Sequence, residues 1–302
     1  PVVIDVRDFL LISETAASNK KGGSNYRQNY HNIYTSKFRL HDLLTPLFDL
    51  YDFININLLK ILLKKLIKKS NKVKLVAISK FMKKQLIKFG FPKEKIEVIY
   101  NIVDKNIFKG KNYKRQNQIV FAGRLEKKKG IWDAIKAFEL IGDNKLKFAI
   151  AGDGTEFENI KYYLKSRNCS NIKLLGKITN EQVLKLYNKS KVLVCPSIWP
   201  EPFGRFILES FTTETPLITT NVGSLPETIK NRETGITIEP NNPIKLAEAI
   251  KELLTNKKLY DGIAKNLAKE AEKYSSEVIG KQRILLYKKI LKKIISHVYA
   301  SC

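Results

Sequence analysis

The chain has 302 residues, a hydrophobic share of 43% and an aromatic share of 10%, values that exclude a disordered protein and favour a globular one. Its length exceeds the usual size of one hydrophobic core, so we expect two domains. The net charge of +26 predicts attraction to polyanions, namely nucleic acid, anionic lipid head groups or phosphorylated small molecules. A surface of solvated lysines is the alternative explanation.

Other sequence features narrow the class of protein. Lysine interrupts the longest apolar segments, so no run of about eighteen apolar residues could span a bilayer, and no signal peptide is present. The three cysteines, Cys169, Cys195 and Cys302, lack the spacing of a metal site and predict reduced thiols in a cytoplasmic protein. Because the sequence begins at Pro1 and its only methionine is Met82, we expect that its natural start is missing.

The first third of the chain is predicted to be an incomplete α/β domain, residues 1–108. Buried strands are expected at 1–6 and 74–79, and helices at 56–69 and 81–90. This region is short for a complete domain of that class.

Residues 109–275 are predicted to form a complete doubly wound α/β domain. Short β-branched segments alternate there with amphipathic segments of helical periodicity, which is typical of parallel βαβ units with helices on both faces. The expected strands are 118–123, 147–152, 172–176, 191–196, 216–220 and 234–239, and the expected helices are 131–141, 157–166, 181–190, 203–212 and 244–254.

The stretch PSIWPEPFGRFILESF places Glu201 at the carboxyl end of a strand and Glu209 in the second turn of the next helix. Open α/β sheets bind ligands in that crevice. At 1.5 Å per helical residue the two carboxylates are on the order of 10 Å apart, which suits the two ends of one elongated ligand. Each carboxylate can accept bonds from vicinal sugar hydroxyls, while the helix N-terminus at Phe203, Gly204 and Arg205 can bind an anion. A solvated role for both glutamates is the alternative.

A second candidate group lies in FAGRLEKKKGIWDA, where Gly123 turns the chain after a strand. Arg124 and Lys129 flank the start of the following helix and could neutralise the charge that develops on a departing nucleoside diphosphate. The sequence shows no cluster of ligands for a metal ion, so we expect no metal or other cofactor. An ordinary basic loop is the alternative interpretation.

Two further motifs are rejected as nucleotide fingerprints. AGDGTEF places Phe157 where a dinucleotide site needs its third glycine, so it predicts a tight turn and no NAD site. LLGKITNEQ is not a phosphate loop, because Asn171 stands at the position of its first glycine and Ile178 at the position of its Ser/Thr.

A further motif, NVGSLPETI, predicts a close backbone approach at Gly223 and a short helix with Glu227 in its first turn.

Taken together, these motifs resemble the retaining, nucleotide-sugar-dependent glycosyltransferases of family 4, whose GT-B fold has two Rossmann-like domains. The resemblance runs over about residues 73–275 and includes five motifs in the family's order. They are E-P-F-G with E-x7-E at 201–209, G-R-L-x-x-x-K-G at 123–130, G-D-G at 152–154, G-x-x-P-E at 223–227, and the strand, helix, strand and linker at 76–104.

The resemblance implies a transfer of a hexose from a nucleoside-diphosphate sugar to a lipid-linked or polysaccharide acceptor. Glu209 would bind the ribose and Glu201 the transferred sugar; Arg124 and Lys129 would hold the diphosphate. The amides of Phe203, Gly204, Arg205 and Phe206 would assist, and the backbone near Gly176 and Lys177 would contact the base. Configuration would be retained by front-face substitution, in which the leaving phosphate helps to deprotonate the acceptor. The helix in residues 276–302 would cross back onto the N-terminal domain.

The chain also departs from the family pattern. In PVVIDVRDF, Arg7 precedes Asp8 where many members have histidine, and a guanidinium cannot act as a base. The family's N-terminal glycine-rich loop is expected to lie before Pro1, although the segment GGS at 22–24 is an alternative. A truncated or degenerate domain that binds nucleotide without turnover therefore remains a competing hypothesis.

The remaining hypotheses concern partners. Basic amphipathic helices at 56–69, with Lys60, Lys64 and Lys68 on one face, and at 279–298 predict peripheral contact with an anionic membrane, at its cytoplasmic face. Core-facing helices with solvated lysines are the alternative. A nucleic-acid-binding protein is the third possibility, but no recognition helix, zinc knuckle or RNP-type strand is found, so no nucleic acid is expected.

Overall fold

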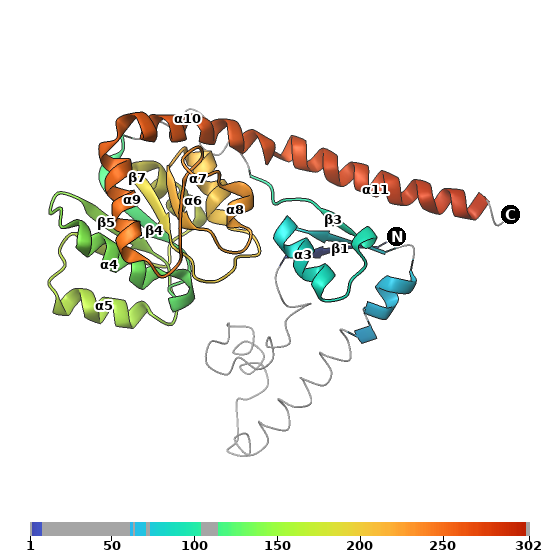
Figure 1. Ribbon diagram of the computed structural model, residues 1–302, viewed down its shortest axis with the longest axis horizontal. Helices are drawn as coiled ribbons and strands as arrows, with labels where there is room; N and C mark the ends of the chain where they lie inside the picture. Colours follow the sequence, from blue (N-terminus) through green and yellow to red (C-terminus); the bar gives the residue numbers. More distant parts are fainter. Residues whose placement is uncertain (1, 8–60, 63, 71–72, 104–113, 300–302) are drawn as a thin grey trace, which may run out of the picture.

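The computed structural model describes residues 2–7, 61–62, 64–70, 73–103 and 114–299, which form two α/β units, each with a parallel sheet (Figure 1). Several residues named in the sequence analysis, namely the segment 22–24, Asp8, Lys60 and Cys302, lie outside the described residues. So do residues 56–60 and 63 of the predicted helix 56–69, whose described residues, 61–62 and 64–69, are helical. Among the described helices, none combines enough length with enough apolar character to cross a bilayer.

The N-terminal sheet has three strands in the order β1-β2-β3. They are β1 (Val2–Val6), β2 (Val73–Ala77) and β3 (Ile96–Val98). Pairing is parallel, with Val2 opposite Val73 and Leu75 opposite Ile96. Because side chains alternate along a strand, β2 sends Leu75 and Ala77 to one face and Val76 to the other.

Helices cover the two faces of this sheet. On the face of Leu75 lie α3 (Lys80–Lys88) and the helix that includes residues 64–69, whose Ile67 is buried there. On the face of Val76 lies α11 (Ser276–Tyr299), through Ile279, Leu286 and Ile290. Figure 1 shows α11 running from the C-terminal unit along the N-terminal sheet. The two basic helices therefore pack on opposite faces of one sheet, because each has its own apolar stripe.

The C-terminal sheet has six parallel strands in the order β6-β5-β4-β7-β8-β9, and all six predicted strands are present. The strands are β4 (Gln116–Ala122), β5 (Lys147–Ala151), β6 (Ile172–Gly176), β7 (Ser190–Cys195), β8 (Leu217–Thr220) and β9 (Ile236–Ile238). Nearly every residue of β7 and β8 is buried, as expected for a parallel sheet covered on both faces.

Helices connect these strands and form one core with the sheet. The connecting helices are α4 (Ile131–Ile141), α5 (Phe157–Ser166), α6 (Asn180–Lys189), α7 (Arg205–Thr213), α8 (Leu225–Thr228), α9 (Pro243–Thr255) and α10 (Lys257–Lys273). The five predicted helices are confirmed within two residues at each end.

Two helix starts differ by two or three residues from the sequence-based expectation, and one helix was not expected. Helix α7 begins at Arg205 rather than Phe203, since Gly204 is an extended N-cap. Helix α11 begins at Ser276, three residues earlier than expected. Helix α10 was not predicted, because its buried residues, Ile263, Leu267 and Ala271, form only a narrow stripe within a polar sequence.

The strand order positions the functional site. From β4 the chain proceeds outward to β5 and β6, then returns to β7 on the other side of β4 and proceeds outward again. Ligands bind at such a reversal, outside the carboxyl ends of the strands. The loops after β4 and β7, residues 123–130 and 196–204, leave the sheet side by side at this point.

Candidate functional site

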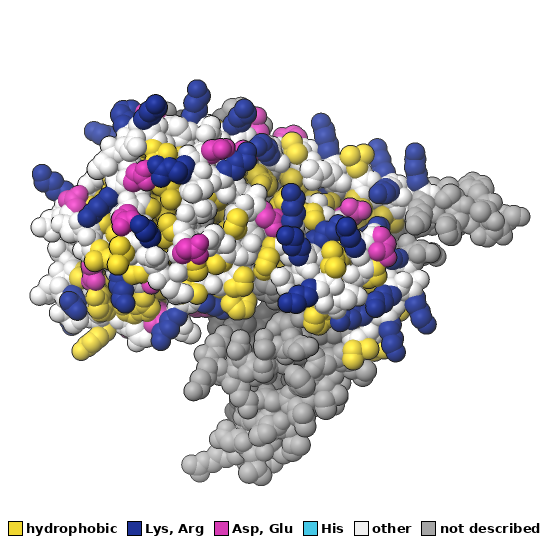
Figure 2. Space-filling view, viewed as in Figure 1, with side chains coloured by type: hydrophobic (Ala, Val, Ile, Leu, Met, Phe, Trp, Pro, Cys, Tyr) yellow, Lys and Arg dark blue, Asp and Glu magenta, His cyan; other side chains and the backbone are white. Residues whose placement is uncertain are grey.

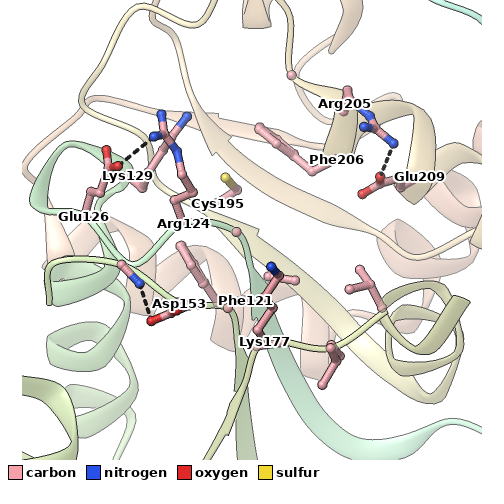
Figure 3. A pocket seen from close by; sticks show the side chains of 18 of the residues that line it. Phe121, Arg124, Glu126, Lys129, Asp153, Lys177, Cys195, Arg205, Phe206 and Glu209 are labelled. Carbon is pink, nitrogen blue, oxygen red and sulfur yellow. Dashed lines mark hydrogen bonds and ion pairs between the residues drawn. The ribbon is translucent and has the colours of Figure 1, made fainter. Parts of the chain in front are cut away.

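A cavity of about 1010 Å³ lies at the carboxyl ends of the central strands. Figure 3 shows Arg124 and Lys129 on one side of it and Arg205 with Glu209 on the other. All ten residues that the sequence predicts for the site line this cavity. They are Gly123, Arg124, Lys129, Lys177, Glu201, Phe203, Gly204, Arg205, Phe206 and Glu209.

Lys129 is positioned by the junction of two loops. It ends the short 3₁₀ helix η4 (Lys127–Lys129), and Gly130 follows with φ +72°, a left-handed conformation. A Cβ on Gly130 would lie 1.8 Å from the carbonyl oxygen of Pro196, so only glycine allows this approach. The carbonyl of Lys128 accepts hydrogen bonds from the amides of Ile198 and Trp199. The loop after β4 is therefore fixed against the loop after β7.

Glu201 is held by two side chains. Lys129 Nζ lies 2.5 Å and Ser197 Oγ 2.8 Å from the same oxygen, Oε1. Glu201 is 6% exposed and Ser197 is fully buried. Because these two donors occupy Oε1, the geometry leaves Oε2 as the oxygen for a sugar hydroxyl. The ion pair also neutralises Lys129, which the sequence assigns to the diphosphate.

Arg124 is similarly paired within the chain. Its guanidinium lies 3.0 Å from Glu126, and Lys128 lies 2.8 Å from the other oxygen of the same carboxylate. The Arg124 side chain is 55% exposed and borders the cavity, so solvent screens this pair. The pair can therefore open at little cost, and the assignment of Arg124 to a diphosphate stays a prediction.

The N-terminus of α7 opens into the cavity. Its N-cap is Gly204, which has no side chain to accept from the first amides of the helix. The positive end of the helix dipole and these amides favour an anion. Arg124 borders the same cavity, so its guanidinium and the N-terminus of α7 are two sources of positive potential there, whereas the charge of Lys129 is balanced by Glu201.

Glu209 lies one turn further along α7. Burial raises the pKa of its carboxyl group, and Arg205, 3.7 Å away, partly opposes this shift. A ribose diol could replace the lost water as the hydrogen-bond donor to this carboxylate. The geometry thus agrees with a diol-binding role for Glu209, which stays a prediction.

The inner wall of the cavity includes Cys195 and Tyr187. Burial raises the pKa of both side chains, so the Cys195 thiol stays protonated and is no nucleophile at neutral pH.

Lys177 borders the cavity near Asn180, where α6 starts with a capping box of Thr179 and Gln182. Among the residues that the structure describes, no group of three or more His, Cys, Asp or Glu side chains could hold a metal ion.

Sequence reasoning assigned no role to Glu126, which lines the cavity, or to Ser197, which holds Glu201. Glu126 stands inside the G-R-L-x-x-x-K-G motif, where an acid between basic residues could have indicated an ion pair. Ser197 gave no signal, because its contact with Glu201 depends on how the loop after β7 folds back.

A second cavity, of about 710 Å³, adjoins the first and shares Phe203, Arg205 and Glu209 with it. Its other walls come from α6 and α7 of the C-terminal unit, from the N-terminal unit and from α11, and they include Arg7 and Arg283. Arg283 forms two hydrogen bonds with the carboxylate of Asp5, which also lies 3.5 Å from Arg7. Three guanidinium groups, those of Arg7, Arg205 and Arg283, thus border this space, and Asp5 pairs with two of them.

Family comparison gives two matches that follow each other along the chain. The model described as Glycosyl transferases group 1 matches residues 102–273, and the one described as Glycosyltransferase Family 4 matches residues 26–106. The match to Glycosyl transferases group 1 contains all ten predicted site residues.

Curated relatives agree with these matches. An uncharacterised glycosyltransferase, MJ1607 of Methanocaldococcus jannaschii, is 31% identical over 233 residues, which are 70% of this chain and 59% of the relative. The capsular polysaccharide biosynthesis glycosyltransferase CapM of Staphylococcus aureus is 29% identical over 240 residues, 72% of this chain and 62% of the relative. The chain thus spans about three fifths of the length of these relatives.

Solved structures share the fold. A glycosyltransferase from Rickettsia africae ESF-5 superposes with a TM-score of 0.66 at 26% identity, covering 73% of this chain and 64% of the other. Alr3699/HepE of Anabaena, in complex with UDP and glucose, superposes with a TM-score of 0.67 at 19% identity. The superposition covers 95% of this chain and 71% of the other. The α/β architecture is that of GT-B glycosyltransferases.

Proposed function

Since the chain belongs to the family of glycosyl transferases group 1, we propose that it transfers a hexose from a nucleoside-diphosphate sugar to a lipid-linked or polysaccharide acceptor with retention of configuration. One observation carries this proposal. Two carboxylates, two cations and an uncapped helix N-terminus meet in one cavity at the reversal of strand order, and this set matches the parts of such a donor.

The proposed roles follow from the geometry. Glu209 accepts bonds from the ribose hydroxyls, and Oε2 of Glu201 accepts one from the transferred sugar. The diphosphate lies between Arg124 and the N-terminus of α7. As the bond from the sugar to the phosphate breaks, charge develops on the phosphate, and these groups stabilise it. In the proposed mechanism the leaving phosphate takes the acceptor proton, as the resemblance to the retaining family implies.

The acceptor would approach from the second cavity, between the two units. Its lining of guanidinium groups suits an acceptor that carries phosphate, such as a lipid-linked one. The alternative is nucleotide binding without turnover. That alternative is favoured by Arg7, since it stands where the family often supplies a histidine.

The first test is thermal unfolding with UDP, GDP and ADP, with and without EDTA. UDP comes first because several structural neighbours are complexes with UDP or UDP-glucose. A ligand at a hundred times its dissociation constant adds about 2.7 kcal/mol to the stability of the native state. We expect one nucleotide to stabilise the chain in an EDTA-insensitive way, and Glu209→Ala to abolish the effect. A cooperative transition that no nucleotide shifts would contradict the proposal.

Release of UDP from UDP-glucose separates transfer from mere binding. With water as acceptor, the bond between the anomeric carbon and the phosphate oxygen breaks and the hydroxyl of water replaces it. Slow release that Arg124→Ala reduces further would support an enzyme. Binding without release, with or without an added lipid phosphate, would favour the degenerate domain.

We also propose that α11 brings the protein to an anionic membrane at the cytoplasmic face. Its outer side exposes Ile284, Leu285 and Leu291, with lysines at 281, 288, 289 and 292 between and beside them. Figure 2 shows that Lys and Arg side chains far outnumber acidic ones over the N-terminal unit and α11. Such a mixture suits the boundary between head groups and acyl chains.

The helix at 64–69 supports this role less well. Lys64 is half-buried, and its ammonium group lies 3.7 Å from the centre of the Phe89 ring, so it does not extend freely towards a membrane.

Vesicle binding tests the role of α11. Vesicles of phosphatidylglycerol, which is anionic, should bind more of the wild-type protein than vesicles of phosphatidylcholine. Replacing Ile284, Leu285 and Leu291 with serine should reduce this binding, whereas the same change at Ile61, Leu62 and Leu66 should not. Equal binding by all three proteins would contradict docking through α11.

A further inference from the structure

Helix α3 belongs to the N-terminal unit, but a residue of the C-terminal unit caps its N-terminus. Glu227, in α8, accepts hydrogen bonds from the amides of both Lys80 and Phe81, with Lys80 N at 2.8 Å. The hydroxyl of Tyr100 donates to the same carboxylate at 3.3 Å. The first amides of a helix have no partner within the helix, so a carboxylate here satisfies two donors and the helix dipole at once.

The third connection comes from Ser79, the N-cap of α3. Its hydroxyl group accepts a hydrogen bond from the amide of Met82 at 3.0 Å and donates its own hydrogen to the carbonyl of Pro202 at 2.7 Å. Pro202 stands between Glu201 and Phe203, both of which line the donor cavity. Ser79 is fully buried, so this bond is shielded from water. The N-cap of α3 is thus bonded directly to the loop that carries the sugar-binding carboxylate.

The segment that carries Glu227 is tied to the same loop. The amide of Ser224 donates to the carbonyl of Glu201 at 3.0 Å. Gly223 has φ +61°, and a Cβ there would lie 2.5 Å from the amide nitrogen of Glu201. The ring of Tyr100 packs on Phe203, with 6.1 Å between centroids. The N-terminus of α3, the loop 201–203 and the segment 223–227 therefore form one connected joint.

From these contacts we propose that Glu227 is a positioning residue, which fixes the N-terminal unit against the donor loop by capping α3 across the boundary between the units. The sequence predicted Glu227 only as an acid in the first turn of its own short helix. Its contacts show a different partner, the helix of the other unit. The effect on transfer rests on the proposed function; the joint itself does not.

Glu227→Gln tests the joint with a minimal change of shape. A carboxamide has one acceptor oxygen, so its NH₂ group must face one of the two amides that the carboxylate now accepts. Glu233→Gln is the matched control, since Glu233 is 66% exposed in the turn after α8 and lies 4.0 Å from Lys230. Both variants lose one negative charge from the same part of the surface.

The first measurement is hydrogen exchange without any ligand. Exchange at the amides of Lys80 and Phe81 should accelerate about tenfold in Glu227→Gln and remain at the wild-type rate in Glu233→Gln. If Glu227→Gln does not fold, Ser79→Ala serves instead and should accelerate exchange at Met82. Unchanged exchange at these amides would overturn the proposal, whatever the enzyme does.

The second measurement is the rate of UDP release from UDP-glucose. The C-terminal unit supplies the donor contacts, so KM should stay within about twofold while kcat falls about tenfold, because the N-terminal unit is no longer aligned with the loop 201–203. Faster exchange with wild-type kcat and KM would overturn the positioning role and leave a purely structural cap. If the wild type releases no UDP, the proposed function fails separately, and the exchange result alone decides the joint.

Discussion

Lys129 Nζ lies 2.5 Å from Oε1 of Glu201, joining the loop after β4 to the loop after β7 across the central strands of the sheet. The two residues are 72 positions apart in the sequence. Their side chains are only 20% and 8% exposed, so the pair is shielded from water. The site therefore holds its own counter-ion, which keeps Lys129 in place.

Breaking this pair should destabilise the chain. Lys129→Met leaves the carboxylate of Glu201 with Ser197 as its remaining partner, at an expected cost of about 3 kcal/mol in the free energy of unfolding. The double variant Lys129→Met with Glu201→Gln should recover part of this loss, since a neutral amide needs no counter-ion. A double-mutant cycle from urea unfolding measures the coupling, expected at about 1–3 kcal/mol. Strictly additive effects would show that the pair does not form in solution.

Arg124 should act on the diphosphate rather than on the nucleoside. Arg124→Ala is expected to weaken UDP binding by about 2 kcal/mol, the loss of a charged hydrogen bond, with a smaller effect on UMP and none on uridine. Calorimetric titration of the three ligands checks this order. Lys127→Ala is the matched control, because Lys127 is exposed on η4 and is not among the residues that line the cavity. An equal loss for all three ligands would mean that the guanidinium does not meet the phosphates.

The sequence predicted the local parts of this site better than their connections. Strand ends and the helix after β7 follow from periodicity, which is why Glu201 and Glu209 could be placed near a crevice. The Lys129 pair depends on which strands become neighbours, and hydrophobic pattern alone does not encode strand order. The cap on α3 depends on how two units dock, so the sequence could place Glu227 only within its own helix.

Glu209 should make the unliganded protein less stable as the pH rises. Burial raises the pKa of this carboxyl group above its usual value of 4.5. Between the usual and the raised value the folded state binds more protons than the unfolded state, so the free energy of unfolding falls with increasing pH. Each pKa unit corresponds to about 1.4 kcal/mol.

Glu209→Gln should therefore raise the melting temperature relative to wild type at pH 7, and the gain should vanish as the pH falls below 4.5. The same variant should bind UDP more weakly, because a carboxamide offers one acceptor oxygen to the ribose diol. Thermal scans from acid to neutral pH, with and without UDP, measure both effects. A melting temperature below that of wild type at neutral pH would contradict the assigned cost of burying this charge.

Arg115 should stabilise the C-terminal unit without affecting the site. Its guanidinium donates to the Thr215 hydroxyl and to main-chain carbonyls where α6 and α7 end. Those carbonyls belong to Tyr187, Asn188, Ser190, Thr213 and Glu214. The last carbonyls of a helix lack partners within it and carry the negative end of the dipole, so one cation here serves two helices.

Arg115→Met should cost about 2–4 kcal/mol in the free energy of unfolding, because it leaves several of these carbonyls without a donor. Arg115→Lys should recover part of this, since an ammonium group keeps the charge but has three donors instead of the planar fork. UDP affinity should stay unchanged, as Arg115 precedes β4 and the cavity lies at the opposite ends of the strands. Arg167→Met, at an exposed guanidinium near Tyr163, is the control and should change stability by less than about 0.5 kcal/mol. Equal effects of the two methionine variants in urea unfolding would refute this role for Arg115.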